Sequence, residues 1–182
     1  MGPYINPPVL LRVTDITGWG ACSELGERKG FYKLSDENYS SYAIQPKHGS
    51  HYLGMEVASD STWDCVIQQL TQPIIADKTY KMSFWLASSK NYPHMVLRKG
   101  LMTDNKPVVM QIWGMNTQDK FSELLYATDS ITNTEWKKYD IRFISTIDCD
   151  LILIKPIYTT EKEVYNGNIL LDNLSKIEFI ED

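Results

Sequence analysis

Apolar and polar residues alternate with a period of two along several stretches of the chain, which is the pattern of half-buried β-strands. In residues 78–87, every second side chain from Tyr80 to Leu86 is apolar, and polar residues fall between most of them. The same alternation runs through residues 107–114 and 137–144. We therefore expect three strands there, each with one face directed into a core.

Other short segments have the composition of strands and are bounded by Gly, Asn, Asp and Thr, which favour turns. They span residues 8–13, 51–57, 64–70, 123–131, 150–158 and 168–180. Helical periodicity is almost absent. Many short strands without intervening helices predict an all-β fold, an antiparallel sandwich of two sheets.

The length of 182 residues fits one domain. We expect residues 1–14 to be an N-terminal segment or a first strand, and residues 15–182 to be a single β-sandwich domain. Residues 15–50 and 88–106 have the least regular pattern. Long connections on a rigid scaffold often carry function, so a binding site is expected near them.

Charge and hydropathy narrow the range of partners. The net charge is −5 and basic residues are nowhere clustered, which argues against a nucleic-acid or anionic-membrane partner. No segment has the length and apolar character of a membrane span, so we expect no membrane insertion. The first residues lack the pattern of a secretory signal peptide.

Three cysteines, Cys22, Cys65 and Cys149, lie far apart in the sequence. Their number and spacing indicate neither a metal site nor a full disulfide framework. We expect them to be small buried apolar residues. A disulfide between Cys22 and Cys65 is the alternative.

The order of several motifs resembles that of galactose-binding-like, carbohydrate-binding-module-type jelly-roll domains from surface and secreted proteins of Bacteroidota. The motifs are "GWGAC", "DSTWDCVIQQL", "PVVMQIWGMN" and "YNGNILLDNLSKI", and the resemblance covers residues 15–180. It departs from the family at Ser61, where such domains often have a turn glycine. The resemblance implies a jelly roll that binds a glycan or polysaccharide outside the cell or at its surface.

Aromatic residues on outward strand faces are the main candidates for a ligand site, because flat rings stack on the apolar faces of sugars. Trp85 and Trp113 lie on the predicted outward faces of two strands, with Gln111 beside Trp113. If these strands are neighbours in one sheet, the rings form a platform. Packing of the rings under the long loops is the alternative. The irregular segment 88–106 adds three candidate ligand-binding residues, Tyr92, His94 and Arg98.

Residues 60–70 place Trp63 and Asp64 at the entrance to a strand that also contains Gln68. A glycosidase needs two carboxylates at a defined separation, and Glu56 is the nearest second candidate. No strand carries a run of several carboxylates on one face. We therefore expect these residues to satisfy backbone groups at a strand end, with Trp63 packed over them, and the protein to have no catalytic residues.

Metal and nucleophile sites have weak support in the sequence. His48 and His51 flank a turn and are expected at the surface, and no Ser-His-Asp or phosphate-binding pattern exists. The family resemblance implies a structural Ca²⁺ held by Asp172 in the last long strand and by Asp15 near the N-terminus. Capping of backbone amides is the alternative role for Asp172.

The expectation is a non-catalytic carbohydrate-binding module that mediates recognition of, or adhesion to, glycans at a cell surface. The alternative is a structural module that binds protein subunits of a larger surface or secreted complex. The same sandwich fold can serve both roles.

Overall fold

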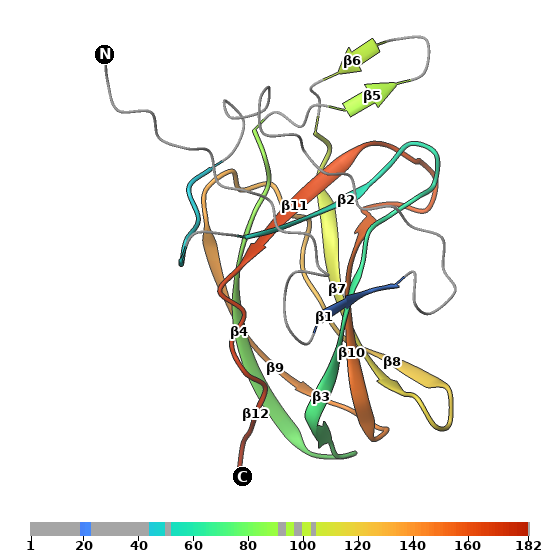
Figure 1. Ribbon diagram of the computed structural model, residues 1–182, viewed down its shortest axis with the longest axis vertical. Helices are drawn as coiled ribbons and strands as arrows, with labels where there is room; N and C mark the ends of the chain where they lie inside the picture. Colours follow the sequence, from blue (N-terminus) through green and yellow to red (C-terminus); the bar gives the residue numbers. More distant parts are fainter. Residues whose placement is uncertain are drawn as a thin grey trace.

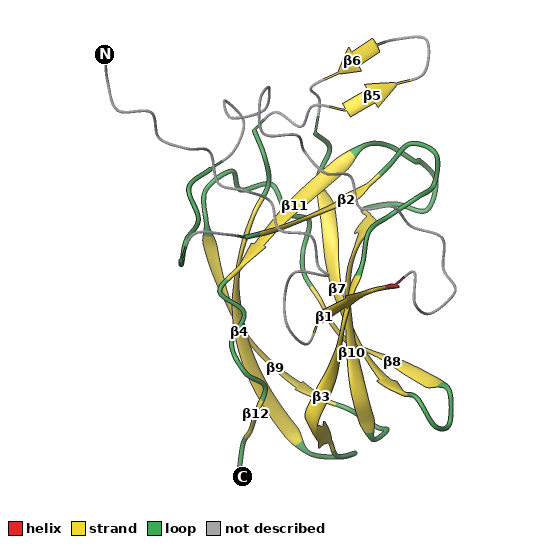
Figure 2. Ribbon diagram, viewed as in Figure 1, coloured by secondary structure: helices red, strands yellow, loops and turns green. Residues whose placement is uncertain are grey.

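The computed structural model describes residues 19–22, 44–49, 52–90, 94–96, 100–102 and 105–181, and these ranges consist almost entirely of strands and loops (Figure 2). Ten strands form two antiparallel sheets that face each other (Figure 1). Within the described ranges, no helix has the length and apolar character that crossing a bilayer requires.

The first sheet has five strands and the second also has five. In spatial order, the first sheet contains β1 (Trp19–Ala21), β3 (Val66–Ile74), β10 (Cys149–Tyr158), β7 (Val108–Asn116) and β8 (Phe121–Ala127). The second sheet contains β9 (Lys137–Ile144), β4 (Thr79–Ala87), β11 (Gly167–Asp172), β2 (Leu53–Val57) and the short β12 (Glu178–Phe179) beside β4. A separate hairpin, β5 (His94–Val96) and β6 (Gly100–Met102), projects from one end of the sandwich (Figure 1).

The core lies between the sheets and is built from the alternating apolar positions. Phe84 and Leu86 of β4 are fully buried against Ile112 of β7 and Ile154 of β10 in one continuous cluster. Burying a large apolar side chain contributes about 1.5–3 kcal/mol. The predicted all-β fold, a two-sheet antiparallel sandwich of jelly-roll type, is confirmed.

Most predicted strands agree with the observed ones, and the differences have local causes. The segment 168–180 divides into β11 and β12 because Asn173 adopts a left-handed conformation, with φ of 50°. Strands β1, β5 and β6 lie in segments that the sequence pattern left irregular. The predicted strand 8–13, and with it residues 1–14, falls outside the described residues.

A disulfide joins Cys22, just after β1, to Cys65, just before β3. Their Cα atoms are 5.6 Å apart, and 43 positions separate them in the sequence. The expectation of unpaired thiols was therefore wrong for these two residues. Cys149 is free and buried, as expected.

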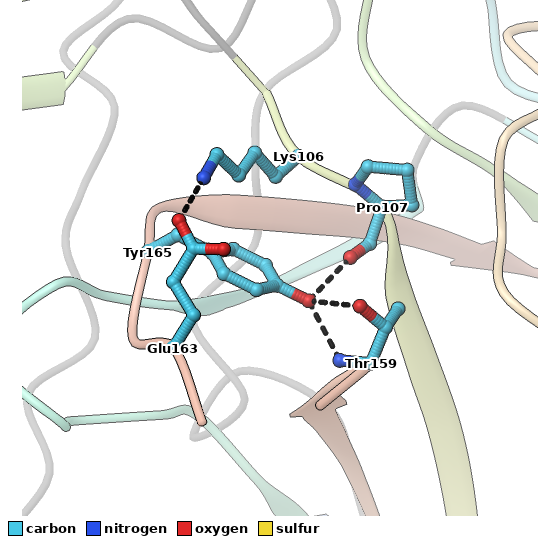
Figure 3. A network of polar contacts seen from close by, with 5 residues as sticks. All are labelled: Lys106, Pro107, Thr159, Glu163 and Tyr165. Atoms are coloured by element: carbon cyan, nitrogen blue, oxygen red, sulfur yellow. Dashed lines mark hydrogen bonds and ion pairs between the residues drawn. The ribbon is translucent and has the colours of Figure 1, made fainter. Parts of the chain in front are cut away.

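The loop that follows β10 is fixed by Tyr165, whose ring is buried (Figure 3). The Tyr165 hydroxyl donates to the Pro107 carbonyl oxygen (2.8 Å) and accepts from the Thr159 amide (2.6 Å). Lys106 forms an ion pair with Glu163 beside the ring. These contacts tie the end of β10 to the start of β7 and hold one end of the first sheet in place.

Candidate functional site

The two tryptophans of the predicted platform lie in different sheets. Trp85 belongs to β4 in the second sheet, and Trp113 belongs to β7 in the first. The two strands are therefore not neighbours, and the prediction that both rings form one platform is wrong. Each ring is half-buried on the outer face of its own sheet.

On the second sheet, the ring of Trp85 is a packing surface for the loop at residues 44–49. The Lys47 ammonium lies 4.1 Å from the Trp85 ring centroid. Asp172, which is paired with Trp85 across β11 and β4, accepts hydrogen bonds from the Lys47 amide (2.6 Å) and the His48 amide (3.0 Å). His48 itself is exposed, as expected.

A second anchor holds the same loop. The Trp136 indole N–H donates to the Gln45 carbonyl oxygen (2.7 Å), and the Trp136 ring packs edge-on against buried Tyr52 at 5.6 Å. Tyr52 continues into a small apolar cluster with Ala87 and Leu170 on the outer face. On this part of the second sheet, Trp85 packs under a loop, which was the alternative to a ligand platform.

The outer face of the first sheet has a different composition. The register aligns Ile67 of β3, Leu153 of β10 and Trp113 of β7 in one row. The adjacent row contains Lys155 and Gln111 as direct partners. A floor of buried side chains, Cys22, Cys65, Ile67, Leu151 and Leu153, supports half-buried Trp63, Trp113 and Met115.

Two indole rings flank one ammonium group on this face. Lys155 Nζ lies 4.4 Å from the Trp63 ring centroid and 5.4 Å from the Trp113 ring centroid. The Trp113 indole N–H donates to Gln111 Oε1 at 2.9 Å. We call Trp63, Trp113, Lys155 and Gln111 the ligand face. Cation–π attraction holds the Lys155 ammonium near both rings. The indole rings are flat, which is the shape that stacking on a sugar requires.

Two residues of the ligand face were not predicted as site residues. Trp63 was expected to pack over the polar residues at a strand end. It lies an even number of positions from Cys65 and Ile67, which are both buried in the outer cluster. Lys155 is the charged residue inside the apolar run 151–157. Both signals were present in the sequence, but only the pairing of β3, β10 and β7 relates them to Trp113.

Asp64 and Glu56 meet at the corner where the chain crosses from the second sheet to the first. The Asp64 amide donates to the Glu56 carbonyl oxygen (2.8 Å), and the Glu56 amide donates to Asp64 Oδ2 (3.0 Å). The predicted structural role of Asp64 is thus confirmed. Gln69, rather than Gln68, supplies an amide contact to the backbone, donating to the Asp150 carbonyl oxygen at 2.7 Å.

The electrostatics of this corner are unusual. Burial raises the pKa of Glu56 to about 8, and the negative charges of Asp64 and Asp60 add to that rise. The Asp60 carboxylate accepts from the Thr62 amide and hydroxyl, which lowers the pKa of Asp60. Between them, Ser61 has φ of 69°, a left-handed conformation that favours glycine.

The other predicted site residues lie outside the described residues or contact the backbone. Tyr92, Arg98 and Asp15 lie outside the described residues, and of His94 only the backbone in β5 is described. Asp172 accepts three backbone amides, the third from Asn173 (2.6 Å). The described ranges contain no group of three or more His, Cys, Asp or Glu placed to hold a metal. The calcium site stays a prediction, and capping accounts for the observed contacts of Asp172.

No protein-family model matches the chain, and no curated protein matches it. Solved structures do match. A CBM4 carbohydrate-binding module aligns over 90% of this chain and 95% of its own, with 11% identity and a TM-score of 0.52. The CBM22-1 xylan-binding domain of Paenibacillus barcinonensis Xyn10C covers 91% of this chain and 87% of its own, with 15% identity and a TM-score of 0.49. At these identities, the similarity to CBM4 shows the fold, a carbohydrate-binding-module-type β-sandwich.

Proposed function

We propose that this protein is a non-catalytic carbohydrate-binding module and that its ligand face binds a glycan. The observation that carries the proposal is the placement of two indole rings on either side of one ammonium group, with an amide in contact with one indole. Rings that stack on sugars, combined with a few polar groups that bond to hydroxyls, are the usual composition of such sites. The fold similarity to carbohydrate-binding modules supports the same class of ligand.

The expected affinity is low for a single site. A sheet face offers a ligand little apolar area, so dissociation constants of about millimolar to micromolar are expected. Repetition of the module in a larger assembly would raise the avidity. The Asp64 carboxylate accepts a hydrogen bond from the Glu56 backbone amide at the corner, which supports a structural role for Asp64 rather than turnover.

The disulfide supports a location outside the cell or at its surface. Cys22 and Cys65 are paired beside the ligand face, and such bonds persist mainly in oxidising compartments. A module of this kind would mediate recognition of glycans or adhesion to them.

The test is binding to a broad glycan array, followed by titration of tryptophan fluorescence with the oligosaccharides that bind. Trp113→Ala and Trp63→Ala should each weaken binding about tenfold or more, as loss of a central aromatic anchor does. Trp85→Ala is the matched control, because its ring lies on the other sheet, and it should leave the affinity unchanged.

Three outcomes would contradict the proposal. Silence across the array, together with self-association in solution, would support a module that binds protein partners. Unchanged affinity in both Trp63→Ala and Trp113→Ala would place the site elsewhere. Hydrolysis of a polysaccharide that is lost in Asp64→Asn would identify an enzyme.

A further inference from the structure

The row of side chains that contains Trp113 continues onto β8, the last strand in the order of the first sheet (Figure 1). Trp113 pairs directly with Leu153 of β10 on one side and with Leu124 of β8 on the other. Directly paired residues of antiparallel strands project from the same face, with Cβ atoms about 4.5–5.5 Å apart. Leu124 therefore lies beside Trp113 on the outer face, where its exposed fraction is 41%.

A β-bulge determines which leucine of β8 faces outward. The register of β7 and β8 shifts between Ile112 and Trp113, and Leu125 is left without a direct partner. Leu125 is buried in the core between the sheets. With regular pairing, Leu125 would stand opposite Trp113 in place of Leu124. Bulges redirect side chains in this way and are common at sheet edges and beside functional sites.

Three apolar groups thus follow one another across the strands of the first sheet. Trp63 precedes β3, Trp113 lies on β7 and Leu124 lies on β8, and the order of these strands is β3, β10, β7 and β8. Trp63 and Trp113 pack on the same buried cluster, and both rings lie close to one ammonium group, that of Lys155. Leu124 extends this line by one strand, which adds about 4.8 Å.

We propose that the glycan is a linear chain that lies across the strands, from Trp63 over Trp113 to Leu124, and that Leu124 contacts the sugar beyond Trp113. This inference rests on the proposed function and goes further by naming the form of the ligand, a segment of several sugars rather than a single terminal sugar. Successive sugars place apolar C–H faces on the two rings and on the leucine. The contact with Leu124 raises the affinity by removing apolar surface from water.

An exposed leucine is common on protein surfaces and indicates no ligand by itself. The direct pairing with Trp113 gives Leu124 its role, because it makes the leucine continuous with the ligand face. Leu124 also lies at the edge of the sheet, so a chain that reaches it can continue past the last strand. A polysaccharide can therefore bind without presenting its end to the protein.

The test is isothermal titration calorimetry with linear gluco-, xylo-, manno- and galacto-oligosaccharides, each series running from the disaccharide to the hexasaccharide. Affinity should rise with length in the series that binds, because a short ligand occupies the two rings first and a longer one also covers Leu124. Leu124→Ala should weaken binding of the hexasaccharide about threefold or more and leave that of the disaccharide unchanged. Ile144→Ala is the matched control, because Ile144 is an exposed aliphatic residue on the second sheet.

The outcomes separate this inference from the proposed function. Hexasaccharide binding that is lost in Trp113→Ala but unchanged in Leu124→Ala would overturn the extended line and leave the glycan-binding function in place. Equal affinity of wild-type protein for every length would overturn it without any variant. Self-association that Leu124→Ala abolishes, with hexasaccharide affinity unchanged, would assign Leu124 to a contact between copies of the chain and also overturn it. Absence of binding in every series would overturn both proposals.

Discussion

The outer faces of the two sheets each present a tryptophan under a lysine ammonium, yet they differ in what surrounds the ring. On the second sheet, Lys47 comes from a loop whose backbone amides are bound by Asp172, so Trp85 serves to seat that loop. On the first sheet, Lys155 belongs to the sheet itself and lies between Trp63 and Trp113. Among the described residues, Trp63 and Trp113 thus have a side chain of the sheet between them, whereas Trp85 has a loop anchored over it.

The largest expected effect concerns the disulfide at the margin of the first sheet. Pairing of Cys22 with Cys65 closes a loop across 43 positions, and the loss of such a constraint on the unfolded chain costs about 4 kcal/mol. Urea unfolding of wild-type protein should show this loss when a reductant is added. The double variant Cys22→Ala, Cys65→Ala should be equally unstable with and without reductant. Identical stability of oxidised and reduced wild-type protein would contradict the role of this bond.

The next effect tests whether the second outer face is structural. Asp172→Ala leaves three backbone amides without their acceptor, and the free energy of unfolding should fall by about 1–3 kcal/mol. Glycan affinity should not change. Asp140→Ala is the control, because exposed Asp140 forms a surface ion pair with Lys138, and it should change stability by less than about 0.5 kcal/mol.

The same variant examines the predicted calcium site. Because the observed partners of Asp172 are backbone amides, the loss in Asp172→Ala should be the same in calcium and in EGTA. A loss that appears only in calcium would instead support a metal held by Asp172.

A third effect, spread over several pH units, is expected from Glu56 at the corner between the sheets. Its folded-state pKa of about 8 lies above the ordinary glutamate value of 4.5, so the folded protein retains a proton that the unfolded chain releases. Stability should therefore fall as pH rises from about 4.5 to about 8, by at most about 1.4 kcal/mol per pH unit. Solvent screening of this half-buried group reduces the slope.

Glu56→Gln should flatten this dependence, because the amide mimics the protonated acid. Thermal unfolding of both proteins from pH 4.5 to 8.5 gives the comparison. If the stability of the wild-type protein and that of Glu56→Gln changed by the same amount across this pH range, the result would contradict the raised pKa of Glu56.

Local alternation was sufficient to predict which side chains enter the core, as for Phe84 and Ile112. It could not assign strands to sheets, because the separation of Trp85 from Trp113 depends on long-range pairing. It also could not show that Asp172 holds a loop located 125 positions earlier in the sequence. The role of Trp63 was missed for the same reason, since Lys155 reaches its ring from β10, far along the chain.

The most direct test of the account is to follow the indole N–H signals of the five tryptophans by NMR while a bound oligosaccharide is added. Assignment comes from single Trp→Phe variants. The account predicts that the signals of Trp63 and Trp113 shift with the same dissociation constant while those of Trp85 and Trp136 stay in place. Shifts of Trp85 and Trp136 with Trp113 unchanged would place the ligand on the second sheet and contradict it.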